Sequence, residues 1–311
     1  MTLKEEYQAS LKSMDTEEWL DLHFYRPMGF AWAKLFAKTG VTPNAVTIFS
    51  IFLGVFGGIL LFPNEIWPNL LGIFLIIWAN TYDSADGQLA RMTKQYSRMG
   101  RILDGVSGDF WFLAIYLAIV FRELYFGDRC FHPFEGSHAW IIWTMAIVAG
   151  LCHAKQAAMA DYYRQFHLYF LKGKEGSELD STAQLKVQYD NMSWGRDGWN
   201  KLVLFFYRGY TRNQERYTPN MQRLRAALHE RYGDEVPPQE FRDSFRKKSL
   251  PLMKYTNILS FNTRIIAMFI SVLINIPWLY FAFELVVLNA LLVYMIVRHE
   301  SKCKAALKEV K

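Results

Sequence analysis

Long apolar segments alternate with polar ones along this chain of 311 residues. Six of the apolar segments approach the roughly 20 residues that a helix needs to cross the hydrocarbon core of a bilayer. They cover residues 43–62, 66–82, 110–126, 139–158, 258–276 and 277–297. The last two are divided only by Asn275, Ile276 and Pro277, which predicts a tight hairpin on one side of the membrane. We therefore expect an all-α integral membrane bundle of six transmembrane helices.

The polar segments divide the chain into four parts. These are an N-terminal amphipathic juxtamembrane segment (1–42), the first four spans (43–160), a cytoplasmic helical insert (161–254), and the last two spans with a basic tail (255–311). The aromatic and basic residues before the first span suit a helix that lies in the membrane interface. At its junction with the span, Thr42 is suited to cap the next helix and Pro43 to occupy its first turn.

The distribution of basic residues predicts how the chain is oriented in the membrane. Lys and Arg gather before the first span, between the second and third spans, and after the fourth, so the positive-inside rule places these segments and both termini in the cytoplasm. The net charge of +6 then indicates affinity for anionic lipid rather than for nucleic acid. The start of the chain shows no cleavable signal peptide and its end no retention signal, which favours a bacterial cytoplasmic membrane.

Carboxylates stand where the second and third spans meet the cytoplasm. Asp83 and Asp86 share one face of a helix with the small residues Gly87 and Ala90, and a second helix beginning near residue 101 would bring Asp104 opposite. Three carboxylates from two helices make an all-oxygen site suited to Mg²⁺ or Mn²⁺. Small neighbours leave space for a flat ligand. Two further side chains, those of Arg91 and Ser97, are well placed to meet anionic oxygens, as phosphoryl chemistry requires.

These residues resemble the signature of the CDP-alcohol phosphotransferases, membrane enzymes that build phospholipids from CDP-activated donors. The signature reads D-x2-D-G-x2-A-R-x8-G-x3-D-x3-D, and the matching positions here are Asp83, Asp86, Gly87, Ala90, Arg91, Gly100 and Asp104. The final position departs from it, because residue 108 is glycine and the next acid is Asp109. On a regular helix Asp109 points roughly 140° away from Asp104, so a π-bulge or local unwinding near Gly105 and Gly108 would be needed to turn it back.

The resemblance implies a mechanism and a set of roles. Two divalent cations, Mg²⁺ or Mn²⁺, would be held by Asp83, Asp86, Asp104 and Asp109, and would grip the pyrophosphate of a CDP-linked donor. Asp109 would take the proton from the hydroxyl of an alcohol acceptor, and CMP would leave. The donor would also be contacted by Asn44, Thr47, Gly87, Ala90, Arg91 and Ser97. Membrane lipids surround the enzyme, and members of the family are often homodimers.

The acceptor stays open at this stage. Lys155 and Arg264 are candidates for a basic pocket that holds a phosphorylated acceptor, which favours a phosphatidylinositol or inositol-phosphate lipid synthase; membrane anchoring explains each of them as well. A head-group transferase acting on diacylglycerol or a ceramide-like alcohol is the enzymatic alternative. From another class comes a non-catalytic membrane protein that binds nucleotide-lipid or transports ions through its intramembrane acids.

Overall fold

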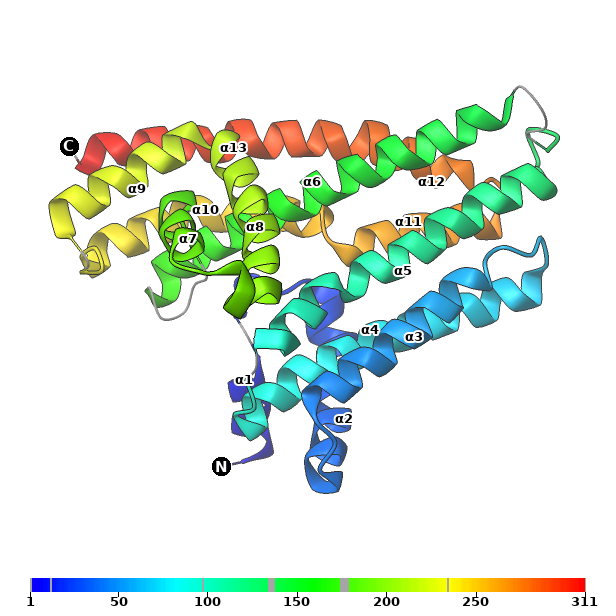
Figure 1. Ribbon diagram of the computed structural model, residues 1–311, viewed down its shortest axis with the longest axis horizontal. Helices are drawn as coiled ribbons and strands as arrows, with labels where there is room; N and C mark the ends of the chain where they lie inside the picture. Colours follow the sequence, from blue (N-terminus) through cyan, green and yellow to red (C-terminus); the bar gives the residue numbers. More distant parts are fainter. Residues whose placement is uncertain are drawn as a thin grey trace. The chain divides into compact units, whose positions relative to one another are not determined.

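The computed structural model describes residues 2–11, 13–96, 98–133, 138–173, 179–233 and 235–310, without the side chains of 98, 99, 101, 102 and 172. Within these ranges the chain is helical and has no strand, which confirms the all-α prediction. The elements in order are α1 (Leu3–Ser10), the π-helical turn η1 (Asp21–Tyr25), α2 (Arg26–Thr39), α3 (Pro43–Ile59), α4 (Ile66–Thr93), α5 (Arg98–Tyr125), α6 (Ala139–Lys172), α7 (Thr182–Asp190), α8 (Trp194–Arg216), α9 (Pro219–Tyr232), α10 (Gln239–Ile258), α11 (Phe261–Leu273), α12 (Trp278–Phe283), η4 (Glu284–Leu288) and α13 (Asn289–Val310) (Figure 1).

Four helical stretches in the described part of the chain are long and apolar enough to cross a membrane, so the protein is an integral membrane protein. They are Leu103–Tyr125, Ala139–Leu171, Gln239–Leu273 and Trp278–Val310. The other two predicted spans fall in α3 and α4. Helix α3 is apolar but has only 17 residues, and α4 is long enough but carries polar side chains through its second half. Four of the six predicted spans are therefore supported.

The chain forms two compact units. The first contains residues 1–151 and 261–285, and the second contains residues 152–260 and 286–311. The helices do not break at the expected limits of the polar insert: α6 continues through residue 160 to Lys172, and α10 continues through residue 254 to Ile258. The side chains change between apolar and polar within these helices, but the helical backbone continues, so the change in hydropathy does not mark a helix end.

In the first unit, α3 packs closely against α4 and α5, because glycines remove side chains from the contact. A Cβ atom on Gly57 would lie 2.8 Å from the carbonyl oxygen of Gly72, and a Cβ atom on Gly72 would lie 2.6 Å from the carbonyl oxygen of Gly57. Helices in lipid associate through such small-residue contacts, since apolar burial gives little advantage over contact with lipid tails. Figure 1 shows α3 and α4 running alongside each other for most of their length.

Replacing Gly57 by Val should therefore separate α3 from α4. The new side chain meets backbone atoms of Gly72 and Ile76, which cannot move aside as a flexible side chain would. Overpacking of this kind costs about 1–3 kcal/mol, and we expect a lower Tm in detergent. Gly209→Ala in α8 is the matched control, because a Cβ there meets nothing within 4 Å. An unchanged Tm for Gly57→Val would contradict the close contact.

The predicted hairpin before residue 278 is confirmed. Asn275 adopts the left-handed conformation with φ +57°. The backbone N–H of Ile276 donates to the carbonyl of Ser271, and this turn follows the end of α11. The fully buried guanidinium of Arg122 at the end of α5 donates to the side-chain oxygen of Asn275 at 2.9 Å and to the carbonyl of Leu61 at 3.0 Å. This arginine joins the ends of three helical hairpins in the first unit.

The second unit contains the later part of α6 together with α7–α10 and the whole of α13. Its core includes Phe166 and Phe170 of α6, which pack against Phe245 of α10. Glu300 of α13 accepts from the backbone N–H groups of Asn220 and Met221 at the start of α9, a helix end where negative charge is favourable. The polar residues between the fourth and fifth predicted spans thus form several α-helices within this unit.

Candidate active site

The second half of α4 carries most of the motif. Asp83, Asp86, Gly87 and Ala90 follow one another at separations of three, one and three residues, and a helix places such residues on one face. Asp86 is only 3% exposed, while Asp83, Gly87 and Ala90 are half-buried. The α-helix runs through these positions without interruption, so the predicted face exists.

Helix α5 brings a third carboxylate to this face. One carboxylate oxygen each of Asp83, Asp86 and Asp104 lie within 4.8 Å of one another. Carboxylates this close repel one another when ionised, and a divalent cation relieves this repulsion while accepting several carboxylate oxygens. The number, chemical type and spacing of these oxygens therefore fit Mg²⁺ or Mn²⁺, and Asp104, being exposed, leaves the site open on one side.

Two hydroxyl groups hold the carboxylates in place. Thr47 of α3, 2% exposed, donates through Oγ1 to Oδ2 of Asp86. Ser107 of α5 donates through Oγ to Oδ1 of Asp83 at 2.8 Å. Hydrogen bonds of this kind orient metal-ligating groups. Sequence reasoning overlooked Ser107, although its position three residues after Asp104 places both on one face of α5.

The start of α3 is as predicted. The hydroxyl of Thr42 accepts from the backbone N–H of Ala45 at 3.3 Å, and Pro43 occupies the first turn. Asn44 follows, half-buried, one helical turn before Thr47. The contact between Thr47 and Asp86 places this face of α3 beside the carboxylates.

Asp109 lies outside the group of three carboxylates. Helix α5 is a regular α-helix past residues 105 and 108, without the π-bulge that would turn Asp109 toward Asp104. Both glycines have open space around them, and Asp109 is exposed. The described geometry thus joins Asp83, Asp86 and Asp104, and it places Asp109 five residues after Asp104 on α5.

Arg91 lies against the backbone of the motif. An ideal Cβ on Gly87 would be 3.5 Å from both terminal nitrogens of Arg91, so the guanidinium passes directly over this glycine. The Nε atom of Arg91 donates to the backbone carbonyl of Ser10, whereas Nη2 is buried and has no hydrogen-bond partner among the described residues. Ser97, also predicted to contact phosphate, lies outside the described residues.

The two basic candidates for acceptor binding belong to different units. In the second unit, Nζ of Lys155 donates to the hydroxyl of Tyr217 at 2.6 Å, and this contact, with the lysine charge beside it, lowers the pKa of Tyr217. In the first unit, Arg264 is 1% exposed and forms an ion pair with Glu284, which is fully buried. The charge of Arg264 is thus matched inside the protein.

The fold and the site define a helical membrane protein with a carboxylate group that could hold a divalent metal, and comparison with known proteins shows which family it resembles. Residues 40–164 match the family model described as CDP-alcohol phosphatidyltransferase. This confirms the predicted family, and with it the prediction that the chain is a phosphotransferase. The matched range contains the whole motif together with Asn44 and Thr47, and it leaves out the N-terminal residues and most of the second unit. A comparison with curated proteins gives no match.

Proposed function

We propose that this protein transfers a substituted phosphate from a CDP-linked donor to an alcohol in phospholipid synthesis, with divalent metal and with release of CMP. The observation that carries the proposal is the group formed by Asp83, Asp86 and Asp104, because it lies within the segment that matches the family and joins two of its helices. A hard, all-oxygen site beside small residues is what transfer from a pyrophosphate requires.

The metal site consists of Asp83, Asp86 and Asp104. Asp109, which lies outside this group in the structure, would join it as the fourth residue after a rearrangement of α5. Two Mg²⁺ or Mn²⁺ ions bound there would neutralise charge on the transferring phosphate and improve CMP as a leaving group. Thr47 and Ser107 hold two of the carboxylates in a fixed orientation. The remaining donor contacts come from Asn44, Gly87, Ala90, Arg91 and Ser97, with Arg91 directed at the diphosphate.

In the reaction, the oxygen of the acceptor hydroxyl forms a bond to the β-phosphorus of the donor. The bond between the β-phosphorus and the oxygen bridging to the α-phosphate breaks, and that oxygen leaves with CMP. The proton of the hydroxyl passes to the carboxylate of Asp109, which is exposed and therefore accessible to an acceptor. A π-bulge or local unwinding of α5 near Gly105 and Gly108 would turn this carboxylate toward the reacting hydroxyl.

A groove beside α5 supports a lipid as one of the two substrates. It has a volume of about 470 Å³, and its lining is entirely apolar: Val55, Ile59, Phe62, Phe110, Leu113, Ala114, Leu117, Ala118 and Phe121. It begins at Phe110, directly after Asp109 on the same helix. An acyl chain in this groove would leave its polar end near the carboxylates, as either CDP-diacylglycerol or a diacylglycerol acceptor requires.

Two acceptor classes remain. A phosphatidylinositol or inositol-phosphate lipid synthase would use Lys155 and Arg264 to hold a polar or phosphorylated acceptor. The ion pair of Arg264 with Glu284 favours the second class, a head-group transferase with a neutral lipid acceptor, because the charge of this arginine is already matched. We place the active site on the cytoplasmic side of a bacterial membrane, and a homodimer is the assembly that the family suggests.

The test is CMP release by the full-length protein in detergent with Mg²⁺ or Mn²⁺. CDP-diacylglycerol and CDP-head-group donors, each with long and short acyl chains where present, are combined with polar and lipid alcohols. We expect release with one pair of substrates, faster with long chains and abolished by EDTA. Absence of release from every pair would contradict the proposed function.

A further inference from the structure

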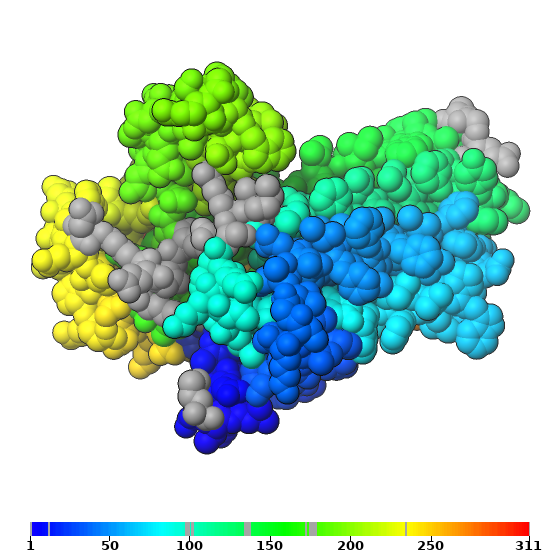
Figure 2. Space-filling model, turned by 60° about the horizontal axis from the view of Figure 1, so that its bottom comes forward, coloured from blue at the N-terminus to red at the C-terminus, as the bar shows by residue number. Residues whose placement is uncertain are grey.

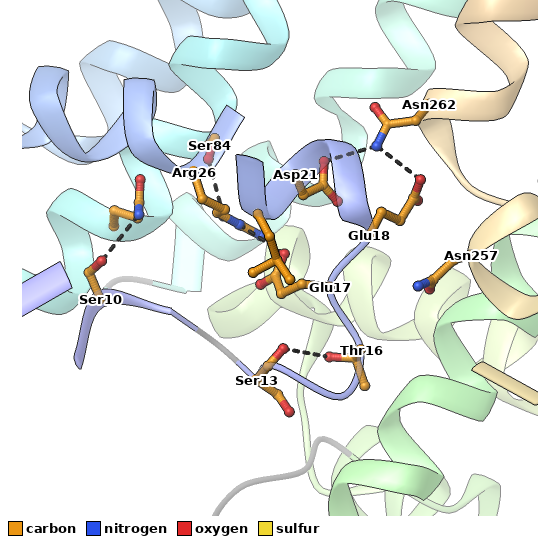
Figure 3. Close-up of polar contacts among 12 residues, drawn as sticks. Ser10, Ser13, Thr16, Glu17, Glu18, Asp21, Arg26, Ser84, Asn257 and Asn262 are labelled. Carbon is orange, nitrogen blue, oxygen red and sulfur yellow. Dashed lines mark hydrogen bonds and ion pairs between the residues drawn. The ribbon is translucent and has the colours of Figure 1, made fainter. Parts of the chain in front are cut away.

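Part of the site comes from residues outside the range that matches the family. Ser10 ends α1, and residues 13–26 lead from there through η1 to the first residue of α2; together we name these residues the N-terminal strap. Figure 3 shows side chains of the strap reaching toward Ser84 of α4 and toward Asn262 of α11. Figure 2 shows the dark-blue N-terminal residues lying against the blue and cyan helices of the same unit.

The first contact of the strap is with the motif itself. Ser10 is 1% exposed and accepts through Oγ from Nε2 of Gln88, which is fully buried, at 3.1 Å. The hydroxyl of Ser10 in turn donates to the carbonyl of Tyr7 at 2.6 Å. The carbonyl of Ser10 accepts from Nε of Arg91. The hydroxyl therefore holds Ser10 in the orientation in which its carbonyl meets Arg91.

The second contact is made by Arg26. Its Nε donates to Oε2 of Glu17 at 2.9 Å, and its Nη1 donates to Oγ of Ser84 at 3.3 Å. Burial by itself lowers the pKa of Arg26, but the carboxylates of Glu17, Asp21 and Asp83 more than offset this and raise it, so the group stays charged. A charged guanidinium is thus held between the strap and the residue that follows Asp83.

The contacts on α4 form one stripe. Ser84, Gln88 and Arg91 are separated by four and three residues, so they lie within about 60° of one another around the helix. Gly29 of α2 lies over the same stripe, since a Cβ there would be 2.7 Å from Oε1 of Gln88 and 2.9 Å from Oγ of Ser84. This stripe adjoins the face that carries the carboxylates, and Arg91 lies at the border between them.

A third contact joins the strap to another helix of the unit. The side-chain amide of Asn262, at the start of α11, donates to Glu18 and to Asp21, both at 2.9 Å. Asn262 is buried, and the strap is therefore attached to α11 as well as to α4. Because the strap is fixed to α11, it can also fix the orientation of the side chains that it contacts on α4.

We propose that the N-terminal strap is a positioning element of the active site, which orients Arg91 toward the diphosphate of the CDP-linked donor. This rests on the proposed function. One nitrogen of the guanidinium is held by the carbonyl of Ser10, and the two terminal nitrogens lie over Gly87, where Nη2 is left for an oxygen of the donor. Ser10 and Arg26 act through Arg91 and Ser84, and they are positioning residues.

The test compares variants of Ser10 in the full-length protein. Ser10→Ala removes the hydroxyl bonds that orient the backbone carbonyl of residue 10 toward Arg91. Weakening the hydrogen bond between that carbonyl and the charged guanidinium should raise the KM for the donor and the Kd for CDP about tenfold, while kcat stays within about twofold. Ser10→Thr should restore both constants. Lys34→Gln is the control, because the ion pair of Lys34 with Glu6 is half-exposed and both residues lie outside the N-terminal strap.

If Ser10→Ala also lowers stability, a double-mutant cycle with Arg91 separates that loss from the effect on Arg91. In an Arg91→Gln background, Ser10→Ala should leave the Kd for CDP unchanged, because the group through which it acts is gone. Equal loss of CDP binding in both backgrounds, or a fall in kcat with KM unchanged, would overturn the role of the strap. CDP binding is measurable even if no donor releases CMP, so a failure of the strap and a failure of the proposed function are distinguishable.

Discussion

Asp104→Asn is expected to abolish CMP release while the protein stays folded. Asn has nearly the same shape as Asp, and residue 104 is exposed, so the helix should tolerate the change. The substitution removes the one carboxylate that α5 contributes to the group of three. The loss of activity should exceed the roughly 10–100-fold that removal of an outer hydrogen-bond partner causes, and binding of Mn²⁺ should weaken with it.

The measurement is CMP release and Mn²⁺ binding for Asp104→Asn beside Ser107→Ala and Asp190→Asn. Ser107→Ala removes only the hydrogen bond to Asp83, and we expect a smaller loss, within that 10–100-fold range. Asp190 is a surface residue that pairs with Lys186 in the second unit, and its variant should behave as the wild type. Full activity of Asp104→Asn would mean that the three carboxylates do not form the metal site.

The largest loss of stability is expected from Arg264→Met. Glu284 is fully buried and receives hydrogen bonds from the hydroxyl groups of Tyr116 and Tyr280 as well as from Arg264. Removing the arginine leaves an uncompensated carboxylate inside a membrane protein, which costs about 3–5 kcal/mol. We expect a strongly lowered Tm for Arg264→Met, and recovery of much of it in the double variant Arg264→Met with Glu284→Gln.

The double variant also tests the acceptor role of Arg264. If the arginine serves only the buried pair, the recovered protein should turn over its acceptor as the wild type does. If the arginine holds an acceptor phosphate, the double variant should be stable yet show a raised KM for a phosphorylated acceptor. A wild-type Tm for Arg264→Met alone would contradict the buried ion pair.

The sequence by itself determined the helices and the motif. Regular spacing on one helix places Asp83, Asp86, Gly87 and Ala90 on a common face, and Thr42 with Pro43 begins the helix before it, because both patterns depend only on neighbours within a turn or two. The family followed from the same positions. The sequence could not determine how far each apolar segment extends as a membrane span, because α4 combines an apolar half with a polar one in a single helix.

Only the tertiary structure decided which distant groups meet. Ser107 contacts Asp83 across 24 positions of sequence, Arg91 contacts Ser10 across 81, and Arg264 contacts Glu284 across a hairpin. Such pairs leave no periodic signal, since they depend on how helices pack rather than on hydrogen bonds within one helix. The placement of Asp109 was decided in the same way: α5 stays a regular α-helix, so the one-residue shift at Gly108 keeps this carboxylate apart from the other three.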